Sequence, residues 1–325
     1  MHHGYRYLWA ESITSRVRII SSDFRGGLPE GERPLCYHLQ PGFSKYSSPV
    51  SIADLHSHSQ SSDGLLSAGE VVRRAVANSV EMLALTDHDT MEGLPAARSI
   101  AEQERIRFVD GVEVSAEWGD MQVHIVGLAV DPSAVDLNAG LASIRSGRIM
   151  RAKRMSSELE KINIPGCFDG AMRYATNPSL IGRSHFARYL VEAAICKDVR
   201  SVFDSYMVPG KPGYVMHDWA TMADAVNWIV KAGGVAVMAH PGRYRLSGQE
   251  LRQLLGEFKD HGGQAIEVVS GSHATDAIAK FSRLAQEYGF LASCGSDFHG
   301  PEESYADLGA IPALPDGLTP VWSAF

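Results

Sequence analysis

The chain has 325 residues, of which 45% are hydrophobic and 21% are charged, so it is long and apolar enough to bury a sizeable core. This composition excludes a disordered, collagen-like or coiled-coil chain. Thirty Lys and Arg residues against thirty-eight Asp and Glu residues give a net charge of −8, which leaves no strongly basic face for a long nucleic-acid duplex. We expect any nucleic-acid ligand to be short or held through metal ions.

Neither a membrane nor an oxidising compartment is indicated. No window approaches the about eighteen uninterrupted apolar residues of a membrane-spanning helix. The four cysteines, Cys36, Cys167, Cys196 and Cys294, form no C-x-x-C pair, and the start of the chain lacks the layout of a signal peptide. We therefore predict a cytoplasmic protein without a membrane partner.

Residues 1–51 differ from the rest of the chain. Glycines and prolines such as Gly26, Gly27, Pro29 and Pro34 interrupt this stretch, and no periodic pattern is sustained. We predict a poorly ordered extension; an upstream region included by the choice of start codon is the alternative. In both cases the function is expected downstream.

From residue 52 onward, short apolar runs alternate with helical patterns. Strands are predicted at residues 52–55, 82–86, 108–114, 123–129, 235–239, 265–269 and 291–294. Helices are predicted at residues 68–78, after an N-cap at Ser67, and at 93–104, 223–232, 249–261 and 275–288. This alternation predicts an α/β protein with a mainly parallel sheet, and seven strands suffice for a barrel.

One stretch, residues 136–209, has helix signals and no convincing strand. Helices are predicted at residues 137–162, 183–194 and 198–206, the first of them ended by Pro165-Gly166. We interpret the stretch as a helical insertion after the fourth strand, where it would overhang the barrel mouth as a lid or a substrate wall. The predicted barrel then comprises residues 52–135 and 210–315, with a tail at 316–325.

The sharpest chemical signal is a pair of histidines at the end of the first predicted strand. His56 and His58 are two residues apart, so in a strand they share a face and can present two imidazoles to one ion. Asp63 follows on the next loop. A pair of ordinary surface histidines is the alternative for this motif taken alone.

Further candidates lie in or after the next three predicted strands. The second run leads to His88 between Asp87 and Asp89, where a carboxylate can bind a metal beside the imidazole or orient it. An N-cap aspartate beside a solvated histidine is the alternative. Glu113 and His124 lie within β-branched apolar runs, where burial without a partner is costly. One shared cation would explain both, although His124 alone is also compatible with a core histidine.

Two later strands end in the same way, one at His240-Pro241 and the other at Asp297-Phe298-His299. All these positions are predicted at the C-terminal ends of strands, the face that carries the active site in barrels of βα units. The nine candidate ligands are His56, His58, Asp63, His88, Glu113, His124, His240, Asp297 and His299. Nine nitrogen or oxygen ligands without sulfur predict two or three divalent ions, with Mn²⁺, Zn²⁺ or Fe²⁺ favoured over Ca²⁺.

These motifs resemble those of the PHP (polymerase and histidinol phosphatase) family. The resemblance extends over residues 52–299 and rests on His56-x-His58, Asp63-Gly64, Thr86-Asp87-His88, Gly111-Val112-Glu113, His124, Ala239-His240-Pro241 and Ser296-Asp297-x-His299. It implies a distorted (βα)7 TIM-like barrel with a trinuclear metal site. It further implies that the first ion binds His56, His58, Glu113 and Asp297, that the second shares Glu113 and adds His124 and His240, and that the third binds Asp63, His88 and His299.

Three further segments, residues 183–188, 209–215 and 270–273, are similar to a branch of this family that has a helical insertion and acts on nucleotides. That branch includes 3′,5′-nucleoside bisphosphate phosphatases and 5′→3′ exonucleases of short RNA. The resemblance implies a hydrolase that removes the 3′-phosphate of a nucleoside 3′,5′-bisphosphate and also degrades short RNA. We expect a metal-activated water as the nucleophile and no covalent protein intermediate; a serine nucleophile is the alternative.

The second phosphate of such a substrate needs cations from the protein. Our candidates are Arg183, His185, Lys211, Tyr214, Arg243 and His273. Arg183 and His185 are predicted to be catalytic, with His185 protonating the leaving ribose oxygen; solvation without any ligand is the alternative for each candidate. The basic run Arg145, Arg148, Arg151, Lys153 and Arg154 is predicted to form a solvated helix face that helps to attract a polyphosphate.

Two other functions stay open. A histidinol-phosphate phosphatase is the second enzymatic hypothesis, although it needs no long helical insertion. A non-catalytic metal-binding module associated with a polymerase is the third, and it requires a partner domain. The sequence does not choose the metal, with Mn²⁺ our first candidate, nor does it give the base preference or the oligomeric state.

Overall fold

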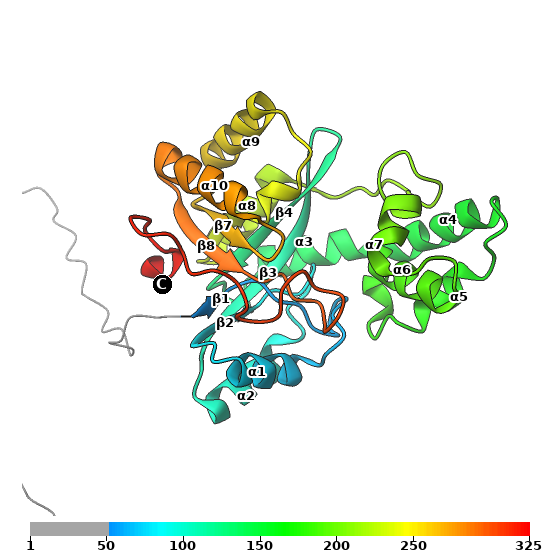
Figure 1. The fold of residues 1–325 in the computed structure, drawn as a ribbon, viewed down its shortest axis with the longest axis horizontal. Helices are drawn as coiled ribbons and strands as arrows, with labels where there is room; N and C mark the ends of the chain where they lie inside the picture. Colours follow the sequence, from blue (N-terminus) through cyan, green and yellow to red (C-terminus); the bar gives the residue numbers. More distant parts are fainter. Residues whose placement is uncertain (1–51) are drawn as a thin grey trace, which may run out of the picture. The chain divides into compact units, whose positions relative to one another are not determined.

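The computed structural model describes residues 52–325, so the extension predicted over residues 1–51 lies outside the described part. The strands in chain order are β1 Ala53–Asp54, β2 Met82–Leu85, β3 Arg107–Trp118, β4 Met121–Leu128, β5 Ala220–Thr221, β6 Val235–Met238, β7 Ala265–Ser270 and β8 Leu291–Gly295. They form one sheet (Figure 1). Its strand order is β1-β2-β3-β4-β6-β7-β8, and the short β5 pairs with β3. The amide of Leu55 donates to the carbonyl of Cys294 at 2.9 Å, which brings β1 against β8 and nearly closes the sheet. The predicted barrel is confirmed.

The fourth strand of the barrel runs against its neighbours. β4 is antiparallel to both β3 and β6, whereas the other strand pairs of the described chain are parallel. Only Gly119 and Asp120 join β3 to β4, which leaves no room for the crossover that a parallel pair requires. Gly119 has a φ of +57°, which glycine adopts without strain in a tight hairpin turn. The sheet is mainly parallel, as predicted, but the reversed strand was not expected.

Five helices pack against the sheet: α1 Ala68–Ala77, α2 Leu94–Glu104, α8 Met222–Lys231, α9 Gly248–Asp260 and α10 Thr275–Tyr288 (Figure 1). Each of them agrees with a predicted helix to within one residue at either end. The N-cap predicted at Ser67 is confirmed, because its hydroxyl accepts from the amide of Glu70 while the Glu70 carboxylate accepts from the Ser67 amide. This reciprocal capping box satisfies two otherwise unpaired groups and fixes where α1 begins.

Residues between β4 and β5 form the helices α3 Val135–Ser146, α4 Arg148–Glu160, α5 Cys167–Met172, α6 Arg183–Glu192 and α7 Val199–Val202, the last continued by a π-helical turn at Phe203–Met207. The prediction of one helix over residues 137–162 is wrong, since α3 ends and α4 begins at Gly147. A Cβ at Gly147 would lie 2.6 Å from the ring of His217, so a side chain does not fit at this junction. Helix α5 was not predicted.

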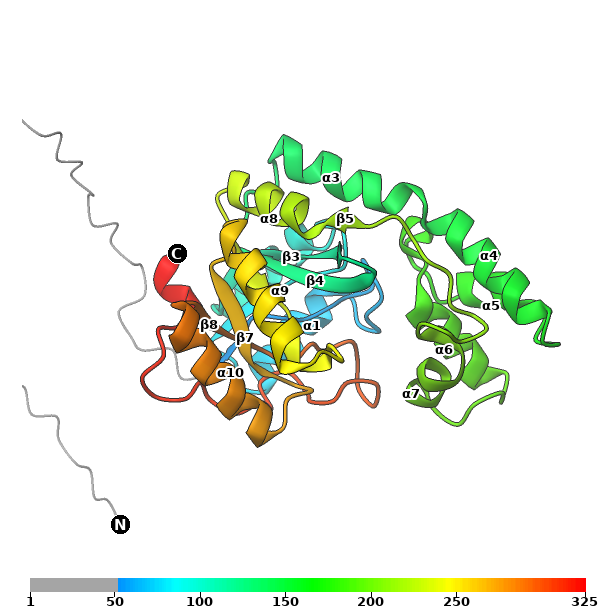
Figure 2. The same cartoon turned by 90° about the horizontal axis from the view of Figure 1, so that it is seen from above.

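The described chain has two hydrophobic cores. The smaller one is built by the clustered helices α4 to α7 and includes Leu159, Phe186 and Leu190 (Figure 2). Helix α3 instead contributes Leu137 and Leu141 to the barrel core. The second core therefore begins within α4, and the predicted boundaries of the insertion stay a prediction.

The predicted tail, residues 316–325, packs against the barrel. The amide of Ala292 in β8 donates to the carbonyl of Thr319 at 2.8 Å, and Val321 in the short helix η4 Val321–Ala324 is fully buried. Within residues 52–325, no helix is both long and apolar enough to cross a membrane.

Candidate metal centre and neighbouring cavity

The nine predicted metal ligands meet at one end of the barrel. They come from the segments that follow β1 (His56, His58 and Asp63), β2 (His88), β6 (His240) and β8 (Asp297 and His299), and from within β3 (Glu113) and β4 (His124). The ring of His58 lies 4.0 Å from that of His299 and 4.6 Å from that of His88, measured between centroids. Side chains that are far apart in the sequence thus form one cluster, which we call the metal cluster.

Two of these residues are not at the C-terminal end of a strand, contrary to our prediction. Glu113 lies within β3, which continues to Trp118, and His124 lies in the first half of β4, opposite Ser115. Because β4 is antiparallel to β3, its beginning lies beside the end of β3. His124 therefore reaches the same end of the barrel from a strand of the opposite direction.

Glu113 is fully buried at the centre of the metal cluster, where five imidazoles surround its carboxylate. Its Oε2 lies 3.0 Å from Nδ1 of His88, 3.2 Å from Nε2 of His56 and 3.3 Å from Nε2 of His58, and its Oε1 lies 2.8 Å from Nδ1 of His124 and 3.1 Å from Nε2 of His240. The two oxygens thus face two different sets of ring nitrogens. This is the geometry expected of a carboxylate that bridges two ions.

Several atoms of the cluster fit a bound cation. Nε2 of His56, Nδ1 of His88 and Oε2 of Glu113 are buried and have no hydrogen-bond partner among the described residues. A ring nitrogen that faces a carboxylate oxygen without a hydrogen bond needs a proton or a cation between the two, because both atoms offer lone pairs. A divalent cation would satisfy these atoms together, and the nitrogen and oxygen donors suit Mn²⁺, Zn²⁺ or Fe²⁺.

Donor atoms of the cluster fall into three overlapping groups, each close enough to share an ion: His56, His58, Glu113 and Asp297; His58, Asp63, His88 and His299; and His88, Glu113 and His124. The first group is the set predicted for the first ion. The second contains the set predicted for the third ion, with His58 added. The third has His88 in place of His240, which still contacts Glu113 at 3.1 Å. The assignment of ligands to individual ions stays a prediction.

Burial opposes charge on several side chains of the cluster. It lowers the pKa of His88 to about 3 and that of His240 to about 4, so both imidazoles are neutral near pH 7 and available as ligands. Burial also opposes ionisation of Glu113, but the surrounding imidazoles outweigh it and hold the pKa of this carboxyl well below its usual range. At His58, hydrogen bonds to two carboxylates outweigh burial and raise the pKa to about 10, so a cation has to displace a proton from that ring.

A carboxylate that sequence reasoning missed, Glu267 of β7, orients two of the histidines. Its Oε1 lies 2.5 Å from Nδ1 of His56, and its Oε2 accepts a hydrogen bond from the backbone amide of His240 at 2.6 Å. This contact fixes the His56 ring so that Nε2 faces Glu113. The signal was available in the sequence, because Glu267 is a lone carboxylate inside a buried apolar run, as Glu113 is.

We expect Glu267→Gln to lower the affinity of the cluster for Mn²⁺ by about 10- to 100-fold, because the neutral amide holds the His56 ring less firmly and makes it a weaker ligand. Equilibrium dialysis with elemental analysis measures the change. Glu287→Gln is the matched control, since Glu287 is exposed on α10 and pairs with Arg252. Equal affinities in wild type and Glu267→Gln would contradict the orienting role.

The two aspartates that flank the histidine after β2 belong to none of the three groups. Asp87 accepts two hydrogen bonds from Ser59 and one from Ser62, at 2.6–2.7 Å. Asp89 pairs with Arg148 of α4. The hydrogen-bond and ion-pair partners of the two carboxylates are protein groups other than His88, so within residues 52–325 the structure supports neither metal binding nor orientation of that ring by them.

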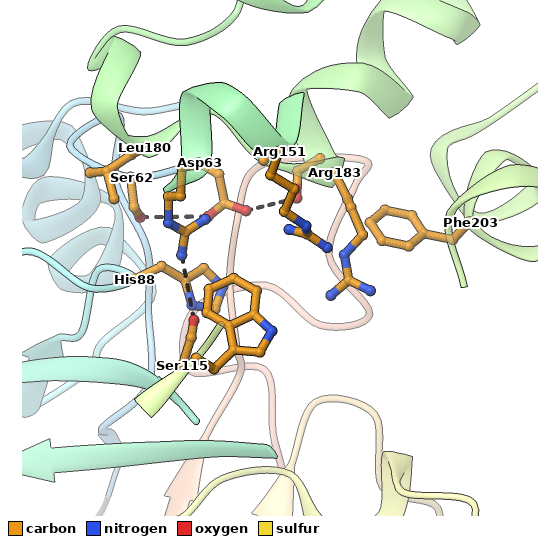
Figure 3. Close-up of a pocket in the computed structure, with 12 residues that line it drawn as sticks. Ser62, Asp63, His88, Ser115, Arg151, Leu180, Arg183 and Phe203 are labelled. Carbon is orange, nitrogen blue, oxygen red and sulfur yellow. Dashed lines mark hydrogen bonds between the residues drawn. The ribbon is translucent and has the colours of Figure 1, made fainter. Parts of the chain in front are cut away.

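A cavity lies beside the metal cluster, between the barrel end and helices α4 and α6 (Figure 3). Asp63 and His88 of the cluster line it, together with Arg148, Arg151 and Arg183. Arg148 pairs with a carboxylate of the barrel, but within residues 52–325 neither Arg151 nor Arg183 forms an ion pair with a carboxylate. Burial and the two neighbouring guanidinium groups lower the pKa of Arg151 to about 9. Such uncompensated guanidinium groups favour a bound anion.

The prediction that the basic run forms a solvated helix face is wrong for two of its residues. Arg148 and Arg151 are 6% and 3% exposed, whereas Lys153 and Arg154 are exposed. The two buried guanidinium groups lie over the ring of Trp219, at 5.0 and 5.2 Å from its centre. Positions 148 and 151 are three residues apart, so both belong to the helix face that packs against the barrel.

Two histidines predicted to contact substrate do not line the cavity. His185 is 1% exposed, its Nδ1 accepts from the amide of Gly182 at 3.0 Å, and burial lowers its pKa to about 4. His273 is 9% exposed; its Nδ1 faces the carbonyl of Val268 at 3.0 Å, and its Nε2 accepts from the amide of Gly242 at 3.1 Å. These contacts are typical of structural histidines. The substrate role of both, and proton transfer by His185, stay predictions.

Of the other four predicted substrate residues, two contact the cavity or the metal cluster. Arg183 lines the cavity, and Arg243 pairs with Oδ2 of Asp297 in the metal cluster. Tyr214 is half-buried on the segment that follows the insertion, and Lys211 on the same segment is exposed. Arg183 and Arg243 are therefore the two candidates in direct contact with the cavity or the cluster.

The fold is a nearly closed α/β barrel, and nine imidazole and carboxylate side chains meet at one of its ends, beside an arginine-lined cavity. These features define a class of barrel protein that is suited to bind several divalent cations next to an anion. In comparisons with known families, the PHP domain matches residues 54–237. The chain therefore belongs to the PHP domain family, and the resemblance found in the sequence is confirmed.

Similar proteins cover most of the described chain. A 3′,5′-nucleoside bisphosphate phosphatase of Chromobacterium violaceum is 52% identical over 269 residues, which are 83% of this chain and 94% of the relative. The 5′-3′ exoribonuclease Rnm of Salmonella typhimurium is 40% identical over 276 residues, which are 84% of this chain and 94% of the relative. A solved structure, described as an amidohydrolase from Chromobacterium violaceum with bound sulfate and no metal, superposes with a TM-score of 0.82 at 51% identity, over 84% of this chain and 95% of that one.

Proposed function

We propose that this chain is a metal-dependent phosphoesterase that removes the 3′-phosphate of nucleoside 3′,5′-bisphosphates and also hydrolyses short RNA from its 5′ end. The observation that carries the proposal is the continuity of the metal cluster with the arginine-lined cavity, because Asp63 and His88 belong to both. The names of the two relatives support the same pair of activities.

The cavity suits the phosphate that is not hydrolysed. Arg151 and Arg183 provide guanidinium groups that bind phosphate oxygens in a fork, and neither is neutralised by a carboxylate of the described chain. A 5′-phosphate held there would place the 3′ side of the same nucleotide toward the metal cluster. One site of this kind serves a bisphosphate and the first linkage of an RNA chain, because both substrates carry a 5′-phosphate and a phosphoester at the 3′ oxygen.

The chain's own residues prepare the cluster for hydrolysis. When bound, divalent cations lower the pKa of water toward neutrality and offset charge on the phosphoryl group. Glu113 and Asp297 would supply negative charge to hold the cations, since both carboxyls keep a pKa well below the usual range. Arg243, paired with Asp297 at the same rim, is placed to contact phosphoryl oxygens.

The alternatives lack a comparable observation. Histidinol phosphate has one phosphate and a cationic amine, which does not suit a second site lined by unpaired arginines. A purely structural metal module does not require such a cavity. We further propose Mn²⁺ as the resident ion, with Zn²⁺ and Fe²⁺ as alternatives, and the cytoplasm as the location, because Cys167, Cys196 and Cys294 are free thiols.

A substrate panel tests the proposal. The purified chain, supplied with Mn²⁺, is assayed with a nucleoside 3′,5′-bisphosphate, a 5′-phosphorylated oligoribonucleotide, the same oligoribonucleotide with a 5′-hydroxyl, and histidinol phosphate. We expect turnover of the first two, with the 5′-hydroxyl form a poor substrate. Absence of turnover of both would overturn the proposal, and preferential hydrolysis of histidinol phosphate would replace it.

Arg151→Met is expected to raise KM for the bisphosphate by about 10- to 100-fold, because losing a charge-assisted hydrogen bond costs about 1.5–3 kcal/mol. The KM of the same variant for a nucleoside 3′-monophosphate, which lacks the 5′-phosphate, should change little. Steady-state kinetics on both substrates measures the difference. Arg154→Met is the matched control, since Arg154 lies one turn further on α4 and is exposed. Equal losses on both substrates would contradict recognition of the 5′-phosphate by Arg151.

A further inference from the structure

Asp63 differs from the other members of the metal cluster in how it is held. It lies on the loop between β1 and α1, and two residues of α6 in the insertion bind it from outside the barrel. The hydroxyl of Ser184 donates to Oδ2 of Asp63 at 2.7 Å, and Nη2 of Arg188 donates to the Asp63 carbonyl at 2.6 Å. One contact fixes the carboxylate and the other fixes its backbone.

Arg188 also holds the second loop of this part of the cluster. Its guanidinium forms a two-pronged pair with the carboxylate of Glu303, with Nη2 at 2.8 Å and Nε at 3.0 Å from the carboxylate oxygens. The Arg188 side chain is 5% exposed, so little solvent weakens the pair. Glu303 is four residues after His299, whose Nε2 lies 3.4 Å from Oδ1 of Asp63. Arg188 therefore ties together the two loops that carry Asp63 and His299.

The remaining part of the cluster is fixed by the barrel itself. Glu113 lies inside β3, where its amide donates to the carbonyl of Thr86 at 3.1 Å and its carbonyl accepts from the amide of Asp89 at 2.9 Å, and His56 is oriented by Glu267 of β7. These supports involve no residue of α6. Glu113 and His56 are thus held directly by the barrel, whereas Asp63 is held directly by a helix of the insertion.

We propose that Ser184 and Arg188 are positioning residues that complete the cation site formed by His58, Asp63, His88 and His299, so that the barrel supports the ions around Glu113 and the insertion adds this further one. The inference rests on the metal cluster of the proposed function. Its physical basis is that a ligand on an irregular loop must be ordered before it can bind a cation. Partners that orient a ligand typically change metal affinity by about 10- to 100-fold.

The test measures the number and affinity of bound Mn²⁺ ions in the full chain, by equilibrium dialysis at graded Mn²⁺ concentrations with elemental analysis. In Ser184→Ala, the weakest of the wild-type affinities is expected to fall by about 10- to 100-fold while the others stay unchanged. Dialysis at a limiting concentration then leaves one Mn²⁺ fewer per chain. Arg188→Met is expected to have the same effect, and Ser184→Thr, which keeps the hydroxyl, is expected to retain the wild-type number.

Arg173→Met is the matched control, because Arg173 lies in the same insertion and pairs with Glu192 on its exposed side. It should bind Mn²⁺ as the wild type does. The inference is overturned if Ser184→Ala keeps the wild-type number and affinities, or if all its affinities fall together. If Arg188→Met does not fold, the result for Ser184→Ala alone tests the inference. A wild-type chain that binds no Mn²⁺ would instead overturn the proposed function, so the two failures are distinguishable.

Discussion

Glu113→Gln is expected to lower the rate of phosphoester hydrolysis by about 1,000-fold or more, the equivalent of about 4 kcal/mol of transition-state stabilisation. The two oxygens of Glu113 face different sets of ring nitrogens, so this carboxylate is the one member of the cluster placed to serve two ions at once. Gln has nearly the same volume, which preserves packing inside β3, but its amide carries no charge and offers a single oxygen. Phosphate release and elemental analysis measure both consequences.

Glu117→Gln is the control for this substitution. Glu117 lies four residues further along β3, on the same face of the strand, but it is only half-buried and outside the metal cluster. We expect wild-type activity and metal content from it. Glu113→Gln should also lose more metal than Glu267→Gln, since Glu267 only orients a ligand. Wild-type metal content in Glu113→Gln would contradict the bridging role.

Much of the barrel was predictable because its signals are local. The helix predicted at residues 275–288 has the same bounds as α10, and Ser67 caps α1 through groups only three residues apart. Strand direction is different, because it depends on what connects two strands. Here the connection is the two-residue turn Gly119-Asp120, which allows only an antiparallel pair.

In the insertion, local sequence signals were not sufficient to predict the helix boundaries. Gly147 in the middle of a helical pattern costs only about 1 kcal/mol relative to alanine, so the pattern alone favours one continuous helix. The pattern also does not show why glycine stands at this junction: the ring of His217, far along the chain, occupies the space that a side chain at position 147 would need. The periodicity of a local sequence pattern does not reveal a contact between residues that are far apart in the chain.

The same distinction applies to the candidate site. The nine candidate ligands were predictable, because charged and ring side chains at the ends of apolar runs are costly to bury without a shared partner. Arg148 and Arg151 were not, since a basic residue on a helix is usually solvated. Their burial depends on how α4 packs against the barrel and on the ring of Trp219, which is supplied by a segment about seventy residues away.

Removal of divalent ions by dialysis against a chelator is expected to abolish hydrolysis and to lower Tm. Cations that bind only the folded state stabilise it by about 2.7 kcal/mol when present at 100 times Kd. For a domain of this size, that corresponds to about 5–10 °C in Tm. Without cations, Nε2 of His56 and Oε2 of Glu113 lie 3.2 Å apart without a hydrogen bond, which adds to the loss.

Readdition of Mn²⁺, Zn²⁺ and Fe²⁺ in separate samples then identifies the functional ion, because the ion that restores hydrolysis should also restore Tm. Glu113→Gln, treated in the same way, is the matched control: it lacks the shared ligand, so its Tm should change less on chelation. Calorimetry measures Tm, and elemental analysis verifies that each sample contains the intended ion. A wild-type chain that is free of metal by this criterion and still hydrolyses the bisphosphate at its original rate would contradict metal-dependent catalysis, whatever the change in Tm.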